Sequence, residues 1–202
     1  LTLLTDGKSQ NLFNTWSEDG ALIAYSSTRR NGADNDLYVM DPRDPKTDRR
    51  VAEVKGGGWA IASFSPDRAK AVVLEYISIS KVNPYLLDLG SGKMSPIGDH
   101  SKPIAYGAAA FARDGTLWAT SNDGSEFLRL GILDVATGKF TPKAPESRWD
   151  VEAFDIAADN GFIAYVLNEA GTARLKLLDP QTGAVRRVDA LPAGQIGGLS
   201  IG

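Results

Sequence analysis

The sequence predicts an all-β protein, because two short motifs recur in phase along the chain. In the first motif an aromatic or aliphatic residue stands three positions before an aspartate, and successive aspartates are 48, 47 and 45 residues apart. In the second motif a short apolar segment ends at another aspartate, at spacings of 47, 46 and 45 residues. The two sets are Asp19, Asp67, Asp114 and Asp159, and then Asp41, Asp88, Asp134 and Asp179. A β-sandwich would explain strands and turns but not this period, so the sequence predicts a segment of a β-propeller.

The first two strands of each repeat are predicted from apolar segments on either side of a tight turn. NLFNTW and WAIASF are examples of the first strand, and the turns that follow read EDG, PDR, RDG and ADNG. Asp bonds its own backbone in such turns and Gly accepts a positive φ. The second strands read ALIAYS, AVVLEY, TLWATS and FIAYVL, which are rich in β-branched and aromatic residues and too short for helices.

The third strand of each repeat is predicted to end at the second recurring aspartate. In three repeats a glycine follows four residues later, as Gly92, Gly138 and Gly183, which indicates a hairpin turn into the fourth strand. The first repeat has instead a longer polar segment, DPRDPKTDRR, which we expect to be a loop. The fourth strands read RVAEV, KMSPI, KFTPK and AVRRV, and the prolines in two of them favour an edge position.

This pattern divides the chain into four complete blades with part of a further blade at each end. Residues 1–9 match the fourth strand of a preceding blade, and residues 191–202 match the first strand of the next blade. We therefore expect a segment of a larger ring that exposes apolar surface and unpaired edges, and that either self-associates through them or has frayed termini. The four complete blades cover residues 10–55, 56–98, 99–145 and 146–190.

The residue that opens the first motif is expected to occupy an equivalent, buried position in each blade. In a propeller this position closes the first strand where neighbouring blades pack face to face. Burying such a side chain stabilises the fold by roughly 1.5 to 3 kcal/mol. The four residues are Trp16, Phe64, Phe111 and Ile156.

The composition of the chain excludes several classes of function. The chain has 202 residues, a formal net charge of −3 and a pI of about 5.2, so nothing in its charge favours nucleic acid or an anionic membrane surface. It has no cysteine, which excludes disulfides, thiolate catalysis and cysteine metal sites. No apolar segment approaches the roughly 18 to 20 residues that span a bilayer, and LTLLTDGKSQ does not resemble a signal peptide. The compartment stays open between cytoplasm and periplasm, with the periplasm favoured.

No residue of this chain is predicted to be catalytic or to hold a cofactor or metal. His100 is the only histidine and lies in a predicted loop. GSGK at residues 90–93 lacks the flanking residues of a phosphate-binding loop and is interpreted as a hairpin turn. NGADND and NDGSE do not have the alternating ligands of a calcium loop.

One local cluster of charge is a candidate binding surface. Arg29 and Arg30 lie in the longest link between a second and a third strand. In an antiparallel meander this link shares a face with the connection to the next blade. Arg29, Arg30, Glu75 and Tyr76 are therefore expected on one rim, where a guanidinium could meet a substrate carboxylate or acids of a partner domain. The alternative is that these charges are solvated or paired within the structure.

The repeat resembles known families. WSEDGALIAYSSTRRNGADNDLYVMD, residues 16–41, resembles the repeat of TolB-like propellers, in which a [WF]-S-x-D-G turn precedes a strand and an LYVMD-type strand follows. GGGWAIASFSPDRAKAVVLEYISISKVNPYLLDLGSGK, residues 56–93, is similar to a blade of the propeller in prolyl oligopeptidase-family serine peptidases, which include acylaminoacyl and dipeptidyl peptidases. In that family a propeller caps an α/β-hydrolase domain and screens the peptides that reach a Ser-Asp-His triad. The chain has no G-x-S-x-G motif, so no triad residue is carried over.

Three functions follow as expectations. The first is a non-catalytic, N-terminal propeller domain of a bacterial prolyl oligopeptidase-like peptidase, whose partners are a C-terminal α/β-hydrolase domain of the same polypeptide and a peptide substrate. The second is a TolB-like scaffold that binds proteins. The third is a propeller enzyme such as a metal-dependent lactonase, for which the first strands supply too few carboxylates, Asn or His.

Overall fold

The computed structural model describes residues 3–201, and every regular element in that range is a β-strand. The strands form four antiparallel four-stranded sheets, each in simple sequence order. Each sheet is one blade of a β-propeller fold, as the repeats predict. The chain divides into two compact units, Leu1–Ile97 and Gly98–Gly202, and each unit contains two blades.

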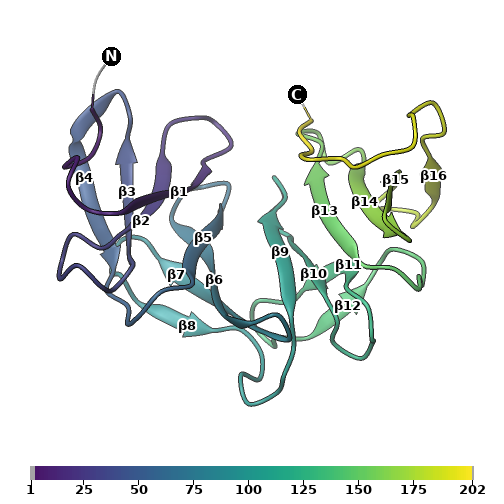
Figure 1. Cartoon of the computed structure of the whole chain (residues 1–202), viewed down its shortest axis with the longest axis horizontal. Coiled ribbons are helices and arrows are strands. Elements are labelled where there is room, and N and C mark those ends of the chain that lie inside the picture. Colours follow the sequence, from purple (N-terminus) through teal and green to yellow (C-terminus); the bar gives the residue numbers. More distant parts are fainter. Residues whose placement is uncertain (1–2, 202) are drawn as a thin grey trace. The chain divides into compact units, whose positions relative to one another are not determined.

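The first unit holds the first and second blades, labelled β1 to β8 in Figure 1. The first blade comprises β1 (Asn11–Trp16), β2 (Ile23–Ser27), β3 (Asp36–Asp41) and β4 (Asp44–Ala52). The second blade comprises β5 (Trp59–Phe64), β6 (Lys70–Ser78), β7 (Lys81–Asp88) and β8 (Met94–Pro96).

The second unit holds the third and fourth blades. The third blade comprises β9 (Tyr106–Phe111), β10 (Leu117–Ser121), β11 (Arg129–Leu133) and β12 (Phe140–Pro142). The fourth blade comprises β13 (Val151–Ile156), β14 (Ile163–Glu169), β15 (Thr172–Leu178) and β16 (Val185–Arg187). Pro96 and Pro142 lie in β8 and β12, which are edge strands of their sheets, as predicted from the prolines.

The first recurring aspartate organises the turn between the first and second strands. In the first blade Ser17 Oγ donates to Asp19 Oδ1 over 2.7 Å, and the N–H of Leu22 donates to Ser17 Oγ over 2.8 Å. The second blade repeats this arrangement, with Ser65 Oγ donating to Asp67 Oδ1 over 2.6 Å. The fourth turn residue has a positive φ in each blade, including 56° at Arg68, where the other repeats have Gly or Asn.

The second recurring aspartate caps the turn between the third and fourth strands. In the fourth blade the N–H of Thr182 donates to Asp179 Oδ1 over 3.0 Å, and the N–H of Gly183 donates to the Asp179 carbonyl over 2.9 Å. Gly92, Gly138 and Gly183 all have positive φ, between 70° and 73°. The predicted glycine-requiring turn is therefore confirmed.

Each unit has a core between its two blades. In the first unit the core joins side chains of β2, β3 and β4 with those of β5, β6 and β7, including Leu37, Ile61 and Leu87. In the second unit it joins β10 and β11 with β13, β14 and β15, including Trp118, Leu130 and Ile163. Apolar residues that alternate along the strands thus make two blades into one folded unit.

The polar segment of the first repeat was wrongly predicted to be a loop. Residues 44–52 form β4, the outermost strand of the first blade, which pairs with β3 from Leu37↔Ala52 to Asp41↔Asp44. Its charged side chains have partners: Arg49 donates to the Leu89 carbonyl over 2.8 Å, and Asp48 binds Arg29. Because these partners lie far away in the sequence, local composition does not reveal the strand.

The four residues of the first motif lie in equivalent positions, but only Phe64 is buried, whereas Phe111 and Ile156 are partly buried and Trp16 is exposed. Trp16, Phe64, Phe111 and Ile156 each end a first strand, opposite the first or second residue of the paired strand. Phe64 is 6% exposed, whereas Trp16 is 53% exposed. The prediction of burial is therefore wrong for Trp16, which lies on the face of the first blade opposite to the core shared with the second blade.

The two end segments form no strand within residues 3–9 and 191–201, although a strand was predicted in each. A strand needs a hydrogen-bonded neighbour, and neither segment has one in its own sheet. Leu1, Thr2 and Gly202, which belong to these predicted strands, lie outside the described residues. The N–H of Ile201 donates to Asp155 Oδ2 of β13, much as Ile61 of β5 donates to Asn14 Oδ1 of β1.

Candidate functional site

Three segments of the first unit meet at one rim: the β2–β3 link, the connection from the first to the second blade, and the β6–β7 hairpin. The N–H of Gly56 donates to Asp34 Oδ1 over 2.7 Å, and the N–H of Asn35 donates to the Gly56 carbonyl over 3.0 Å. The N–H of Tyr76 donates to the Gly58 carbonyl over 2.8 Å. The structure thus places the segments that carry Arg29, Arg30, Glu75 and Tyr76 along one connected rim.

Arg29 is held within the first blade by a carboxylate and two aromatic rings. Its guanidinium contacts Asp48 at 2.5 and 3.1 Å and lies 3.7 Å from the ring centroid of Tyr38. Tyr38 stacks on Tyr25, whose hydroxyl donates to Asp48 Oδ1 over 2.6 Å. Burial, followed by the hydrogen bond to Asp48, raises the pKa of Tyr25, so this hydroxyl stays protonated. The group is a closed arrangement of paired charges and stacked rings.

Arg30 is held by an acidic cluster at the base of the same rim. Its Nε donates to Asp36 Oδ2 over 2.6 Å, and its Nη2 donates to Asp34 Oδ2 and to the Val54 carbonyl over 2.9 and 3.0 Å. The Asp36 side chain is fully buried and also accepts the Val54 N–H over 3.0 Å. Burial works to raise the pKa of Asp36, but its bonds with Arg30 and Val54 outweigh burial and lower that pKa.

Glu75 is also engaged inside its blade. Its Oε2 accepts hydrogen bonds from Asn83 Nδ2 over 2.9 Å and from the Tyr85 hydroxyl over 3.0 Å. Burial and the bond to Glu75 raise the pKa of Tyr85 to about 12. The Tyr85 ring lies 5.3 Å from that of Trp59, centroid to centroid. Glu75 therefore orders the base of the β6–β7 hairpin.

The end of this hairpin carries three exposed apolar side chains, which we name the apolar tip: Tyr76, Ile77 and Ile79. They are 56%, 53% and 88% exposed. Sequence reasoning placed Tyr76 here but missed Ile77 and Ile79, because EYISIS was taken only as the end of a strand. The signal in the sequence was that apolar and polar residues alternate at the end of EYISIS. β6 runs to Ser78 and β7 starts at Lys81, so only a two-residue turn separates the two strands of a long hairpin.

The glycines of the connection between the first and second blades allow the hairpin to approach closely. Gly58 has a φ of 82°, and a Cβ there would lie 2.5 Å from the Tyr76 carbonyl oxygen. Gly57 has no such constraint, since a Cβ there would meet nothing nearer than 4.0 Å. Gly58 thus fixes how the apolar tip stands on the rim.

Among residues 3–201, no group of three or more His, Cys, Asp or Glu side chains is arranged to hold a metal ion. The same residues include no helix long and apolar enough to cross a membrane. The rim consists of internally paired charges below an exposed apolar tip, an arrangement that suits contact with a macromolecule.

Comparison with solved structures places this architecture among known propellers. A protein assigned as TolB from Agrobacterium tumefaciens matches with a TM-score of 0.70 and 18% identity, over 89% of this chain and 65% of its own. TolB from Acinetobacter baumannii matches with 0.70 and 21%, over 91% and 44%. The S511A mutant of puromycin hydrolase complexed with PGG matches with 0.73 and 17%, over 95% and 33%. The chain thus spans about two thirds or less of the length of each of these proteins.

No protein-family model matches the sequence, and no curated protein matches it significantly. At identities of 21% or below, the structural likeness shows the fold. The chain has the β-propeller fold found in TolB and in puromycin hydrolase.

Proposed function

We propose that this chain is the non-catalytic propeller part of a serine peptidase of the prolyl oligopeptidase type. It docks an α/β-hydrolase domain of the same polypeptide and restricts which peptides reach the active site. The observation that carries this proposal is the match to puromycin hydrolase over 95% of the chain, which occupies 33% of that protein. The likeness of residues 56–93 to a peptidase propeller blade supports it independently.

The rim gives this function specific residues. Arg29 and Arg30 could bind a substrate carboxylate only by giving up Asp48 and Asp36, so their part is to hold the rim in shape. The apolar tip projects from this rigid base, and burying its side chains against another domain would remove them from water. Tyr76 and the two isoleucines are therefore the docking residues of the proposal.

The test uses the natural full-length protein and chromogenic peptides of increasing length. If the apolar tip docks a hydrolase domain, the double variant Ile77→Ser/Ile79→Ser loosens the closed assembly. We expect the cleavage rate of long peptides to rise relative to that of short ones, with the unfolding of the propeller unchanged. Leu191→Ser, which alters an exposed leucine of the second unit, is the control. An unchanged ratio of long to short rates in the double variant contradicts the docking role.

A TolB-like protein-binding scaffold is the second candidate. The observation that favours it is the match to two TolB structures, of which the chain covers a larger share than it does of puromycin hydrolase. This function requires a natural protein without a G-x-S-x-G motif and without peptidase activity. Sequencing the gene beyond the codon for Gly202 separates the two candidates directly.

A further inference from the structure

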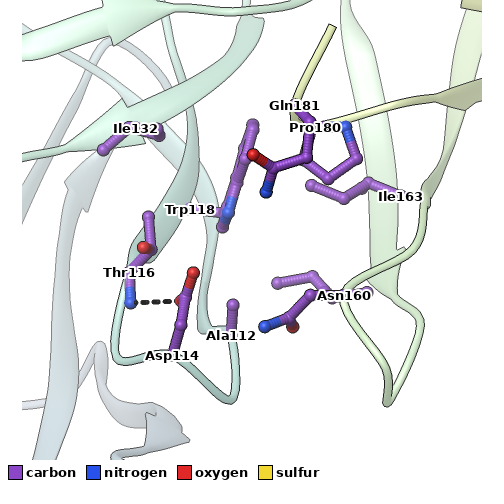
Figure 2. Close-up of a pocket in the computed structure, with 10 residues that line it drawn as sticks. Ala112, Asp114, Thr116, Trp118, Ile132, Asn160, Ile163, Pro180 and Gln181 are labelled. Atoms are coloured by element: carbon purple, nitrogen blue, oxygen red, sulfur yellow. Dashed lines mark hydrogen bonds between the residues drawn. The ribbon is translucent and has the colours of Figure 1, made fainter. Parts of the chain in front are cut away.

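A cavity of about 200 Å³ lies between the third and fourth blades, inside the second unit. Figure 2 shows Asp114 and Asn160 near one end, Pro180 and Gln181 near the other, and Trp118 between them. Only about 10–15 Å³ of such volume is needed to hold one water molecule, so this cavity can accept a group of several heavy atoms.

At the equivalent place in the first unit an ion pair bridges the two blades. Arg68 of the second blade reaches back to Asp19 of the first blade, with Nη1 and Oδ2 3.0 Å apart. Asp114 occupies the position of Asp19 in the third blade, and Asn160 occupies the position of Arg68 in the fourth. Arg68 and Asn160 also share a left-handed backbone, with φ values of 56° and 57°. The second unit therefore keeps the acid of this pair and lacks the arginine.

Three neighbouring positions carry side chains that fill the same place less well in the second unit, although Trp118 and Ile163 there replace the smaller Ala24 and Ala71. In the first unit Leu22, Phe64 and Leu89 pack into the core between the blades. In the second unit the corresponding turn and strand positions carry Thr116 in place of Leu22, Ile156 in place of Phe64 and Pro180 in place of Leu89. Thr and Ile are smaller than the residues they replace, and Pro lacks the flexible side chain of Leu. All three of these line the cavity.

Asp114 brings to the cavity an exposed carboxylate that has no ion-pair partner among the described residues. Within residues 3–201 its side chain forms no ion pair, and its one hydrogen bond accepts the N–H of Thr116 over 2.9 Å through Oδ1. Asn160 uses its Oδ1 to accept the N–H of Arg113 over 3.3 Å. The cavity therefore presents one negative charge, an aromatic wall at Trp118 and the amide of Gln181.

We propose that this cavity binds an alkylguanidinium group, the side chain of an arginine in a peptide ligand. A guanidinium would take the place that Arg68 has in the first unit and pair with Asp114 as Arg68 pairs with Asp19. Its planar donors suit a carboxylate, and its methylene chain and cationic plane suit the Trp118 wall. This inference is independent of the proposed peptidase function, since it rests only on the difference between the two blade junctions.

The binding test compares two ligands of similar shape that differ in the charge and hydrogen-bond donors of the end group. N-acetyl-arginine methylamide carries the guanidinium, and N-acetyl-citrulline methylamide replaces it with a neutral urea group of the same shape. We expect the arginine ligand to shift the indole N–H resonance of Trp118 in a saturable way, and the citrulline ligand to bind at least about tenfold more weakly because the charge-assisted bond is lost. Equal affinity for the two ligands, or no saturable shift with arginine, overturns the proposal.

Variants of the chain locate the site. Asp114→Asn keeps an acceptor for Thr116 but removes the charge, so arginine binding should fall about tenfold, to the level of citrulline. Asp159→Asn is the matched control: Asp159 accepts the Gly161 N–H over 2.8 Å in the corresponding turn of the fourth blade, but it does not line the cavity. Equal loss of binding in both variants overturns the assignment of Asp114.

A third variant tests the comparison between the units. Asn160→Arg installs the arginine that the first unit has, at a φ that Arg68 already adopts. The new side chain should pair with Asp114, abolish arginine binding and leave the fold intact. Wild-type affinity in a folded Asn160→Arg protein would show that the ligand binds elsewhere.

Discussion

At the scale of single residues, the first blade depends on one buried carboxylate. Asp36 is fully buried and binds Arg30, Arg50 and the Val54 N–H. Asp36→Ala leaves two arginines without this partner, and we expect the free energy of unfolding to fall by about 3 kcal/mol. Urea unfolding measures the change. Asp189→Ala, which removes an exposed partner of Arg187, should have little effect, and equal losses in the two variants would contradict the role of Asp36.

The same carboxylate makes stability depend on pH. The folded state lowers the pKa of Asp36 below its unfolded value of about 3.9, so the stabilisation is complete above that pH and is lost as the pH falls through the folded pKa. We expect wild-type stability to fall below about pH 4, and Asp36→Asn to lose less over the same range. Unfolding free energies measured from pH 7 to pH 3 give the comparison. Parallel curves would show that Asp36 is not the group that titrates.

At the scale of elements, the β6–β7 hairpin depends on a glycine that only the structure explains. Gly58→Ala should destabilise the protein by about 1–3 kcal/mol, because the backbone is left-handed and the new Cβ would overlap the Tyr76 carbonyl. Gly57→Ala next to it has space and an ordinary φ, so it serves as the control. Thermal unfolding of both variants is the measurement. A Gly58→Ala protein as stable as the control would contradict the close approach.

The sequence predicts most strands and turns because the signals are local. Ser-x-Asp and Asp-x-x-x-Gly carry their own hydrogen bonds, so their turns appear where the motifs recur. Only the end of β4 was predicted, from RVAEV. Its polar part, residues 44–49, was missed because side chains there have partners far away in the sequence, such as Arg29, 19 residues from Asp48. The place of Ile77 and Ile79 at the exposed end of the β6–β7 hairpin was missed, because the length of a hairpin depends on how its two strands pair. The rim itself was predicted from topology, whereas the ion pairs within it could not be.

At the scale of the whole molecule, exposed aromatic side chains of β1 in the first blade provide a surface for the expected self-association. Phe13 and Trp16 are 59% and 53% exposed and lie 6.2 Å apart, centroid to centroid. We expect the mean mass of this 202-residue chain to rise with concentration in light scattering, and Phe13→Ser/Trp16→Ser to suppress the rise. Leu191→Ser is the control. A strictly monomeric wild-type chain over the whole concentration series would contradict this expectation.

The proposal that this propeller belongs to a serine peptidase is tested most directly by labelling of the active-site serine. A fluorophosphonate probe reacts with the activated serine of a Ser-His-Asp site. The account predicts that the natural full-length protein is labelled at a serine within a G-x-S-x-G motif, and that the 202-residue chain alone is not labelled. A natural protein that lacks this motif and takes up no label would contradict the peptidase function and leave the TolB-like scaffold in its place.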